Sequence, residues 1–370
     1  MPPLGPDAGG RASRPSLTER MVRESLAAIR AWAPTWRPRH RMRAAVATLA
    51  LGVAVLIVAW TAPRPVADLY RRFQRSLAAV TKVASIERLP AADKAVDVRL
   101  GRSTVAGAIL YLPPTFRSTD GTYDLVVHFH GNVGLVEESI ALADINAAVV
   151  IVNVGLGSGV YDQRFSGPAV LPAVLDRVDE EIGRRGLPSP HRRRVALTAW
   201  SAGYGAVVRI LESGALGDSL DAIVLLDGFH AAFDQKQQVD LARLTPFVEF
   251  AHMAMRGERL LSITHSEIDP YTYPSSTRTT DALLGQLGLP RTPGGARPVL
   301  PPFSQMHGVP KDKLLPLEPT SECHSGSFHV RGFTGQTPEA HMAHLIYMAT
   351  LALPELAQRW NATTAAAHQP

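Results

Sequence analysis

Cysteine is almost absent from this chain, with Cys323 the only one in 370 residues. A single cysteine excludes a framework of intramolecular disulfides and a zinc site built on several cysteines. It is compatible with a reducing compartment, and equally with an exported domain that is large enough to need no disulfides. At this length the chain can bury a sizeable core without them.

Net charge is also scarce once the N-terminus is set aside. The whole chain has a formal charge of +5, with 38 Lys and Arg against 33 Asp and Glu. Residues 1–43 hold nine arginines and three acidic residues, so this basic N-terminal tail carries +6 and the rest of the chain sums to −1. Binding of nucleic acid needs positive charge gathered on one surface. The near-neutral remainder therefore argues against a nucleic-acid partner.

Long uncharged apolar runs are missing except at residues 44–62. This run of nineteen residues is close to the roughly 20 that an α-helix needs to cross the core of a bilayer. We expect an uncleaved transmembrane helix here, followed by a stalk or linker helix over residues 63–95. A cleaved signal peptide beginning at Met42 is the rival interpretation. Against it, residues 60–63 (WTAP) offer no clean cleavage site.

Arginines flank the apolar run on both sides, in nearly equal number. The positive-inside rule therefore favours a cytoplasmic N-terminus only slightly. On this basis we expect a single-pass membrane protein whose larger C-terminal part is extracytoplasmic, with membrane lipids as partners of the anchor. The sequence does not indicate an oligomeric state.

From about residue 96 to residue 360, short apolar segments alternate with amphipathic ones. This alternation predicts an α/β domain with a mostly parallel central sheet and helices on both faces. Residues 290–325 are rich in proline and predict an irregular insertion, and residues 361–370 a tail. The expected strands are Thr104–Leu112, Tyr123–Phe129, Ala147–Val154, Arg194–Trp200, Ala222–Asp227, Arg259–His265 and Ser327–Phe333. The expected helices are Leu135–Ile145, Ala169–Arg185, Ala202–Glu212, Leu241–Met255, Ser276–Leu287 and Pro338–Leu351.

Ser201 stands where one expected strand ends and the next helix begins. A serine on so tight a turn projects its hydroxyl above the edge of the sheet, and the residues two positions away on either side must be small. Here they are Ala199 and Gly203. The pattern resembles the nucleophile elbow of the α/β-hydrolase superfamily, G-x-S-x-G, with alanine in place of the first glycine. A serine that only caps the helix is the alternative.

A second part of the resemblance is a buried strand that ends in His130-Gly131-Asn132, about seventy residues before the serine. The resemblance implies that the loop after this strand and the residue after the serine supply the amides of an oxyanion hole. Carried over, these donors are the amides near Asn132 and that of Ala202. Two such amides stabilise the oxyanion of a tetrahedral intermediate. His128 and His130 are alternatively core histidines or a metal pair, but no metal partner is evident and we expect no metal.

The catalytic base is expected on the helix that follows the last strand. His341 and His344 both lie there, behind Thr337 as a plausible N-cap and Pro338 at the first helical position. A histidine at this place would lie over the same edge of the sheet as Ser201 and could take its proton. His341 is nearer the loop and is preferred, with His344 in reserve.

Two aspartates compete for the role of the acid that orients this histidine. Asp269 follows the penultimate expected strand, which is the usual position in the superfamily, and Asp227 ends the strand before it. The sequence does not choose between them, and Glu267 is a more distant third. Either aspartate satisfies the order Ser, Asp, His along the chain that this fold uses.

The residues together predict a membrane-anchored serine hydrolase that cleaves a small-molecule or lipid ester, or an amide, without a cofactor. An acyltransferase that uses the same three residues is one alternative. A catalytically inactive, membrane-tethered binding module is another, from a different class of protein. The fold alone does not identify the substrate.

Overall fold

The computed structural model describes residues 98–310 and 313–366. The basic tail, the apolar run at 44–62 and the linker at 63–95 lie outside these residues, so the anchor and its orientation stay predictions. Among the helices that the structure does describe, none is long and apolar enough to cross a membrane.

The described chain folds around one ten-stranded sheet with the strand order β1-β2-β4-β3-β5-β6-β7-β10-β9-β8. The strands from β4 to β10 in this order are parallel, and the pairs at both edges are antiparallel. The strands are β1 (Gly101–Val105), β2 (Ala108–Leu112), β3 (Thr122–Phe129), β4 (Ala148–Val152), β5 (His191–Trp200), β6 (Leu220–Leu226), β7 (Leu260–His265), β8 (Thr292–Pro293), β9 (Pro319–Ser325) and β10 (Phe328–Phe333).

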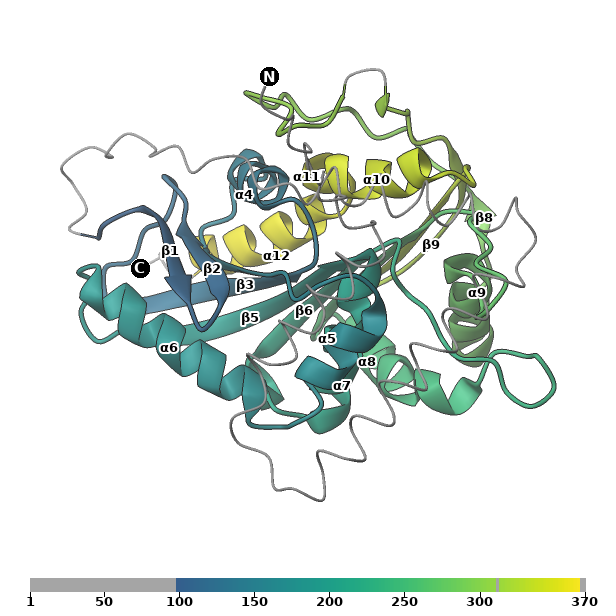
Figure 1. Cartoon of the computed structure of the whole chain (residues 1–370), viewed down its shortest axis with the longest axis horizontal. Helices are drawn as coiled ribbons and strands as arrows, with labels where there is room; N and C mark the ends of the chain where they lie inside the picture. Colours follow the sequence, from purple (N-terminus) through teal and green to yellow (C-terminus); the bar gives the residue numbers. More distant parts are fainter. Residues whose placement is uncertain (1–97, 311–312, 367–370) are drawn as a thin grey trace, which may run out of the picture. The chain divides into compact units, whose positions relative to one another are not determined.

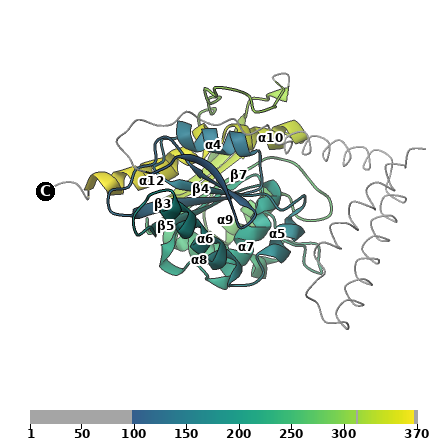
Figure 2. The same ribbon diagram turned by 60° about the vertical axis from the view of Figure 1, so that its left-hand side comes forward.

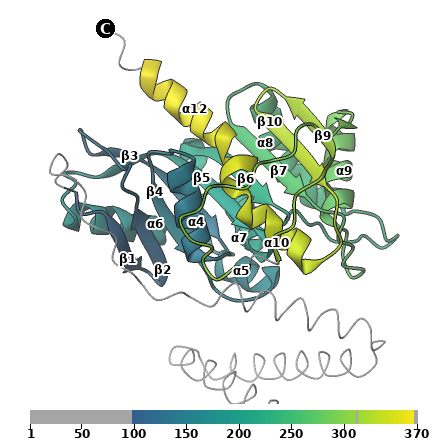
Figure 3. The ribbon, with the colours of Figure 1, turned by 90° about the horizontal axis from the view of Figure 1, so that it is seen from above.

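Helices cover both faces of the sheet (Figures 1 and 2). One face carries α4 (Val133–Leu142), α10 (Pro338–Ile346), α11 (Met348–Leu351) and α12 (Leu353–Ala366). The other carries α5 (Ser158–Arg164), α6 (Val170–Arg184), α7 (Tyr204–Ser213), α8 (Thr245–Met255) and α9 (Ser276–Leu287). Viewed from above, α10 and α12 cross the middle of the sheet (Figure 3). The predicted α/β class with helices on both faces is confirmed.

Two separate apolar cores follow from this arrangement, one on each face of the sheet. Alternate side chains of a strand point to opposite faces. In β3, Val127 and Phe129 therefore join the core under α6 and α7, whereas Val126 joins the core under α4 and α10. The near-continuous apolar sequence of the central strands reflects burial on both sides, as is typical of parallel sheets.

The structure corrects the sequence-based prediction at the edges of the sheet. The segment Thr104–Leu112 forms no single strand but turns back at Ala106 and Gly107, giving the antiparallel hairpin β1–β2. Both turn residues have positive φ, 50° and 80°, as a two-residue hairpin turn requires. The prediction placed a strand through this turn because the apolar pattern continues across it.

The C-terminal third also holds more regular structure than predicted. Strand β9 lies within the proline-rich segment 290–325, where it pairs antiparallel with β10, and β8 pairs with β9. Helix α12 continues past residue 360 to Ala366, into the segment expected to be a tail. Helix α5, only seven residues long, had no sequence signal of its own.

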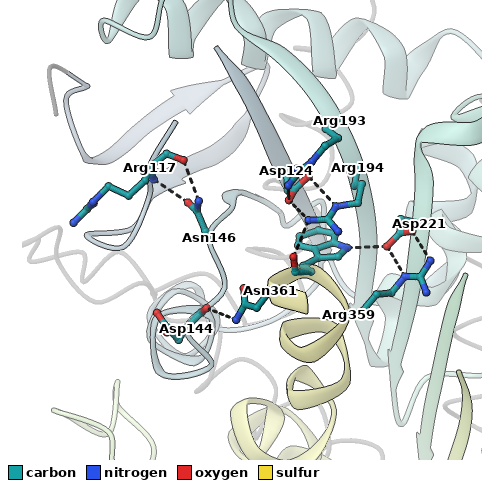
Figure 4. Close-up of polar contacts among 10 residues, drawn as sticks. Arg117, Asp124, Asp144, Asn146, Arg193, Arg194, Asp221, Arg359 and Asn361 are labelled. Carbon is teal, nitrogen blue, oxygen red and sulfur yellow. Dashed lines mark hydrogen bonds and ion pairs between the residues drawn. The ribbon is translucent and has the colours of Figure 1, made fainter. Parts of the chain in front are cut away.

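Arginine–carboxylate pairs fasten α12 to the strands at their amino ends (Figure 4). Asp221, at the start of β6, accepts two hydrogen bonds from the Arg359 guanidinium, each 2.8 Å long, and one of 2.7 Å from the Trp360 indole. Burial alone would raise the pKa of Asp221, but Arg359 and Trp360 outweigh it and the pKa is lowered. The carboxylate therefore stays ionised beneath the helix.

A second carboxylate lies beside the first. Asp124 of β3 is 4% exposed and binds the guanidinium groups of Arg193 and Arg194 from β5, each through two hydrogen bonds. The Arg194 guanidinium also stacks over the Trp360 ring, 5.1 Å from its centroid. Paired hydrogen bonds of this kind are among the strongest between charged side chains. We call these residues, with Asp221 and Arg359, the amino-edge clamp.

Candidate active site

Three neighbouring strands are each followed, at the carboxyl edge of the sheet, by a residue with unusual backbone angles. The residues after β3, β5 and β6 are His130, Ser201 and Asp227, and their φ angles are 67°, 53° and 46°. Left-handed backbone is uncommon for residues other than glycine and concentrates at functional sites. Since these strands are adjacent in the sheet, the three residues lie along one stretch of its edge.

Ser201 occupies a turn that only small neighbours allow. A Cβ atom on Gly203 would stand 2.0 Å from the carbonyl oxygen of Phe129, at the end of β3. A Cβ atom on Gly228 would stand 2.4 Å from the carbonyl oxygen of Ser201 itself. The backbone of Ser201 thus passes tightly between the ends of β3 and β6. This is the strand-to-helix turn that the sequence around Ser201 predicts.

His341 and Asp227 meet directly, although 114 residues separate them. The Nδ1 atom of His341 lies 2.7 Å from Oδ2 of Asp227, and the side chains are 6% and 2% exposed. A carboxylate in this position holds the imidazole in the tautomer that leaves Nε2 able to accept a proton. The structure thereby brings together the preferred histidine and one of the two aspartates between which the sequence did not choose.

Ser266, the first residue after β7, holds the Asp227 carboxylate from the other side. Its amide donates to Oδ1 and its hydroxyl to Oδ2, both at 2.7 Å. Burial alone would raise the pKa of Asp227, but the nearby His344, the hydrogen bond from His341 and the Ser266 amide lower it well below its ordinary value. Asp227 is therefore an ionised, fully hydrogen-bonded carboxylate at neutral pH.

The tryptophan before Ser201 supports His341. The Trp200 indole donates a 3.0 Å hydrogen bond to the main-chain carbonyl of His341, and the two rings lie 4.8 Å apart. The start of α10 is fixed by Thr337, whose side chain accepts from the Ala340 amide as predicted for an N-cap. The strand that ends at Ser201 and the helix that carries His341 are thus joined next to the site.

The reserve histidine, His344, has different surroundings. It is fully buried, and its Nδ1 contacts the Thr264 hydroxyl at 2.8 Å rather than a carboxylate. Burial lowers the pKa of His344 to about 4, with Asp227 opposing the shift and His341 adding to it. A neutral imidazole with so low a pKa is a weak base at pH 7. The geometry favours His341 over His344.

Asp269 and Glu267 lie on the exposed loop after β7 and make other contacts. The Asp269 carboxylate accepts from the Tyr271 amide, 3.0 Å away. The Glu267 carboxylate accepts from the Gly335 amide, 3.3 Å away. The geometry therefore favours Asp227 as the partner of the imidazole, because its carboxylate is the one hydrogen-bonded to His341.

The loop after β3 is rigidly held. Asn153, just beyond β4, binds Gly131 twice: its side-chain oxygen accepts from the Gly131 amide and its side-chain nitrogen donates to the Gly131 carbonyl, each at 3.0 Å. The His130 amide donates to the Val152 carbonyl. The next residue along the chain is Asn132, near which the resemblance implies one of the oxyanion donors. Asn132 also caps α4, accepting from the Leu135 amide.

His128 of β3 and His130, the residue after this strand, have partners within the protein. His128 donates from Nε2 to the His130 carbonyl and contacts the Thr198 hydroxyl through Nδ1, and His130 contacts the Tyr161 hydroxyl. Burial lowers the pKa of His128 to about 3 and that of His130 to about 4. Among the described residues no three His, Cys, Asp or Glu side chains are grouped so that they could hold a metal ion.

Three supporting residues escaped the sequence analysis: Trp200, Ser266 and Asn153. Each directly ends or follows a strand of the parallel part of the sheet, at the edge where ligands bind in open α/β folds. Position at a strand end was therefore the only signal available. What each side chain touches depends on strands that lie far apart in the sequence.

Comparison with known proteins adds little to this site. No protein-family model matches the chain, and no curated protein matches it in sequence. Among solved structures it is similar to the crystal structure of LpqC, a poly(3-hydroxybutyrate) depolymerase from Bordetella parapertussis. The two are 13% identical with a TM-score of 0.36, and the match covers 73% of this chain and 86% of the other. Similarity at this level assigns no activity, so the function has to be inferred from the residues of the site.

Proposed function

We propose that this protein is a serine hydrolase of the α/β-hydrolase superfamily that cleaves a carboxylic ester or an amide. The observation that carries the proposal is the 2.7 Å contact between His341 Nδ1 and the Asp227 carboxylate, at the sheet edge where Ser201 occupies its left-handed turn. A nucleophile, an orienting acid and a base, in this order along the chain, form the set of groups that acyl transfer needs.

In the proposed reaction the hydroxyl of Ser201 attacks the substrate carbonyl while Nε2 of His341 takes its proton. Asp227, ionised because its pKa is lowered, stabilises the resulting imidazolium across the hydrogen bond to Nδ1. The imidazolium then donates its proton to the leaving alcohol or amine. Water attacks the acyl-enzyme in the second half, with His341 again acting as base, and the carboxylic acid leaves.

Negative charge develops on the carbonyl oxygen in both halves of this reaction. We assign its stabilisation to the amides of Asn132 and Ala202, which belong to the loop after β3 and to the first turn after Ser201. Preorganised amides of this kind matter because they need no rearrangement as the charge appears, and losing one typically costs about 3–4 kcal/mol.

A fluorophosphonate probe tests the proposal. We expect the wild-type protein to be labelled and to hydrolyse p-nitrophenyl acetate, and Ser201→Ala to do neither. Ser213→Ala is a matched control, since this serine ends α7, the helix that begins just after the Ser201 turn, at the end away from the site. Equal labelling of the wild type and of Ser201→Ala, or no labelling of either, would contradict the proposal.

We also propose that residues 44–62 anchor the protein in a membrane, with the catalytic domain outside the cytoplasm and a small-molecule or lipid ester as the substrate. The support is the uncharged run and its arginine flanks in the sequence. The full chain should remain in the membrane fraction after a carbonate wash. A reporter enzyme fused after residue 90 that is active only in the cytoplasm would contradict the orientation.

A further inference from the structure

The proline-rich insertion reaches the candidate oxyanion loop through residues 303–309, which we call the insertion tip. The tip lies against the first turns of α4, the helix that begins directly after Asn132. Glu138 of α4 accepts from the Ser304 amide with one carboxylate oxygen and contacts the His307 imidazole with the other. The His307 and Glu138 side chains are only 10% and 16% exposed, so this contact is largely removed from solvent.

The tip is also joined to the oxyanion loop itself. The side-chain nitrogen of Asn132 donates to the His307 carbonyl at 3.0 Å, while its side-chain oxygen accepts from the Leu135 amide at 3.1 Å. The Asn132 side chain is therefore held from two directions, by its own helix and by the insertion. Because the side chain and the amide belong to one residue, fixing the first restricts the orientation of the second.

Two features of the backbone are consistent with the contact between the insertion tip and α4. His307 has a φ of 47°, a left-handed conformation that a residue with a side chain adopts only when its surroundings impose it. A Cβ atom on Gly134 would stand 2.2 Å from Nδ1 of His307. Glycine within a helix is unfavourable by roughly 1 kcal/mol relative to alanine. At position 134 it leaves the space that the His307 ring fills.

We propose that Glu138 and His307 are positioning residues for the candidate oxyanion hole: through the Asn132 side chain, the insertion tip holds the Asn132 amide in the orientation that stabilises the reaction's negative charge. This inference rests on the proposed function of the site. Neither residue is assigned a contact with substrate. Their effect is geometric, and displacements of about 1 Å near reacting groups can reduce rates as much as 100-fold.

The insertion tip and α4 come from distant parts of the sequence. Ser304 and His307 are 166 and 169 positions from Glu138 in the chain, so only folding brings them together. Partly buried apolar residues of the tip, Phe303 and Met306, pack against the core under α4 and α10. This packing holds the insertion tip against α4, and the polar contacts at Asn132 and Glu138 fix its position along the helix.

Three variants of the full-length protein test the inference. Glu138→Ala removes both carboxylate contacts, whereas Glu138→Gln keeps an acceptor for the Ser304 amide and a side chain that can bind His307. Gly134→Ala displaces the His307 ring while improving the helix propensity of α4. Glu137→Ala is the matched control, because its carboxylate lies on the same helix but pairs with Arg102 of β1 rather than with the insertion tip.

The readouts are kcat and KM for p-nitrophenyl acetate and the rate of fluorophosphonate labelling. We expect kcat and the labelling rate to fall about 10-fold in Glu138→Ala and Gly134→Ala, with KM and the unfolding temperature of Gly134→Ala nearly unchanged. Glu138→Gln should recover most of the rate. The control should lose stability without this loss of kcat.

The possible outcomes separate this inference from the proposed function. If the wild type is labelled and both Glu138→Ala and Gly134→Ala keep its kcat, the inference is overturned and the proposed function stands. The inference is also overturned if Glu137→Ala lowers kcat as much as Glu138→Ala, because the cause would then be the stability of α4. If the wild type is neither labelled nor active, the proposed function fails and the inference fails with it.

Discussion

The two edges of the central sheet are built from the same strands in opposite ways. At the amino edge, β3, β5 and β6 carry Asp124, the paired arginines and Asp221 of the clamp, within regular strands. At the carboxyl edge, the same three strands end in His130, Ser201 and Asp227, all with left-handed backbone. The first edge gathers strong charge-assisted contacts, and the second gathers strained residues and neutral histidines.

This difference indicates that the amino end of each strand serves stability and the carboxyl end serves the candidate active site. Backbone strain of the kind at the carboxyl edge costs about 1–3 kcal/mol per residue and persists only where the rest of the fold compensates. The amino-edge clamp fastens α12 to the sheet and supplies part of that compensation. If so, substitutions at one edge should mainly change activity, and substitutions at the other should mainly change stability.

The largest effect is expected from Asp227→Asn. The amide preserves the volume of the carboxylate but removes the charge that orients and stabilises His341, so hydrolysis of p-nitrophenyl acetate should fall by about 10³-fold to 10⁴-fold. Asp269→Asn is the control, and we expect its activity to stay within a few-fold of wild type. Steady-state kinetics on both variants make the comparison. Comparable losses in the two, or a greater loss in Asp269→Asn, would assign the orienting role differently.

Acid should destabilise the protein through the buried histidines of the carboxyl edge. Burial lowers the pKa of His130 and His344 to about 4, whereas an unfolded histidine titrates near roughly 6.5. Between these pH values the unfolded chain binds more protons, so the free energy of unfolding should decrease as the pH falls from about 6.5 towards 4. At about pH 4, each of these histidines lowers the free energy of unfolding by roughly 3 kcal/mol relative to neutral pH.

Urea unfolding at several pH values measures this dependence, and His344→Gln provides the comparison. The variant should show a smaller decrease in stability on acidification than the wild type. The lowered pKa of Asp227 acts in the same direction but at lower pH, since its stabilising effect is present above roughly pH 4 and disappears below it. An unchanged pH dependence in His344→Gln would show that this histidine does not contribute.

At the other edge, Asp221→Ala should lower the free energy of unfolding by about 3 kcal/mol. The substitution leaves Arg359 and the Trp360 indole without their shared acceptor, and breaking one side of a buried ion pair is strongly destabilising. Urea unfolding at neutral pH gives the stability, and kcat of the folded variant should match the wild type. A large fall in kcat without a fall in stability would contradict the division between the edges.

The smallest expected effect is that of Ser266→Ala. The hydroxyl shares Oδ2 of Asp227 with His341, so removing it leaves the carboxylate that orients the imidazole less firmly held. We expect kcat to fall less than about 10-fold, because the Ser266 amide still holds the carboxylate. Steady-state kinetics with p-nitrophenyl acetate measure the loss. A kcat identical to that of the wild type would mean that the hydroxyl has no influence on the base.

Much of this structure could be predicted from local sequence. The apolar runs placed the central strands, and helix α9 was predicted with its bounds, Ser276–Leu287. The serine turn could be predicted because the small residues Ala199 and Gly203, two positions on either side of Ser201, allow a tight strand-to-helix turn. The hairpin at Ala106, strand β9 and helix α12 could not, since their boundaries depend on pairing and packing rather than on periodicity.

The sequence by itself determined the α/β class, the position of Ser201 at a strand end and a short list of candidate partners. Those features follow from residue size and apolar periodicity, which act over a few positions. The tertiary structure decided that Asp227 rather than Asp269 contacts His341, that Ser266 and Trp200 support the pair, and that the insertion tip reaches Asn132. These choices depend on which strand ends become neighbours in the sheet, and no local pattern in the sequence specifies that order.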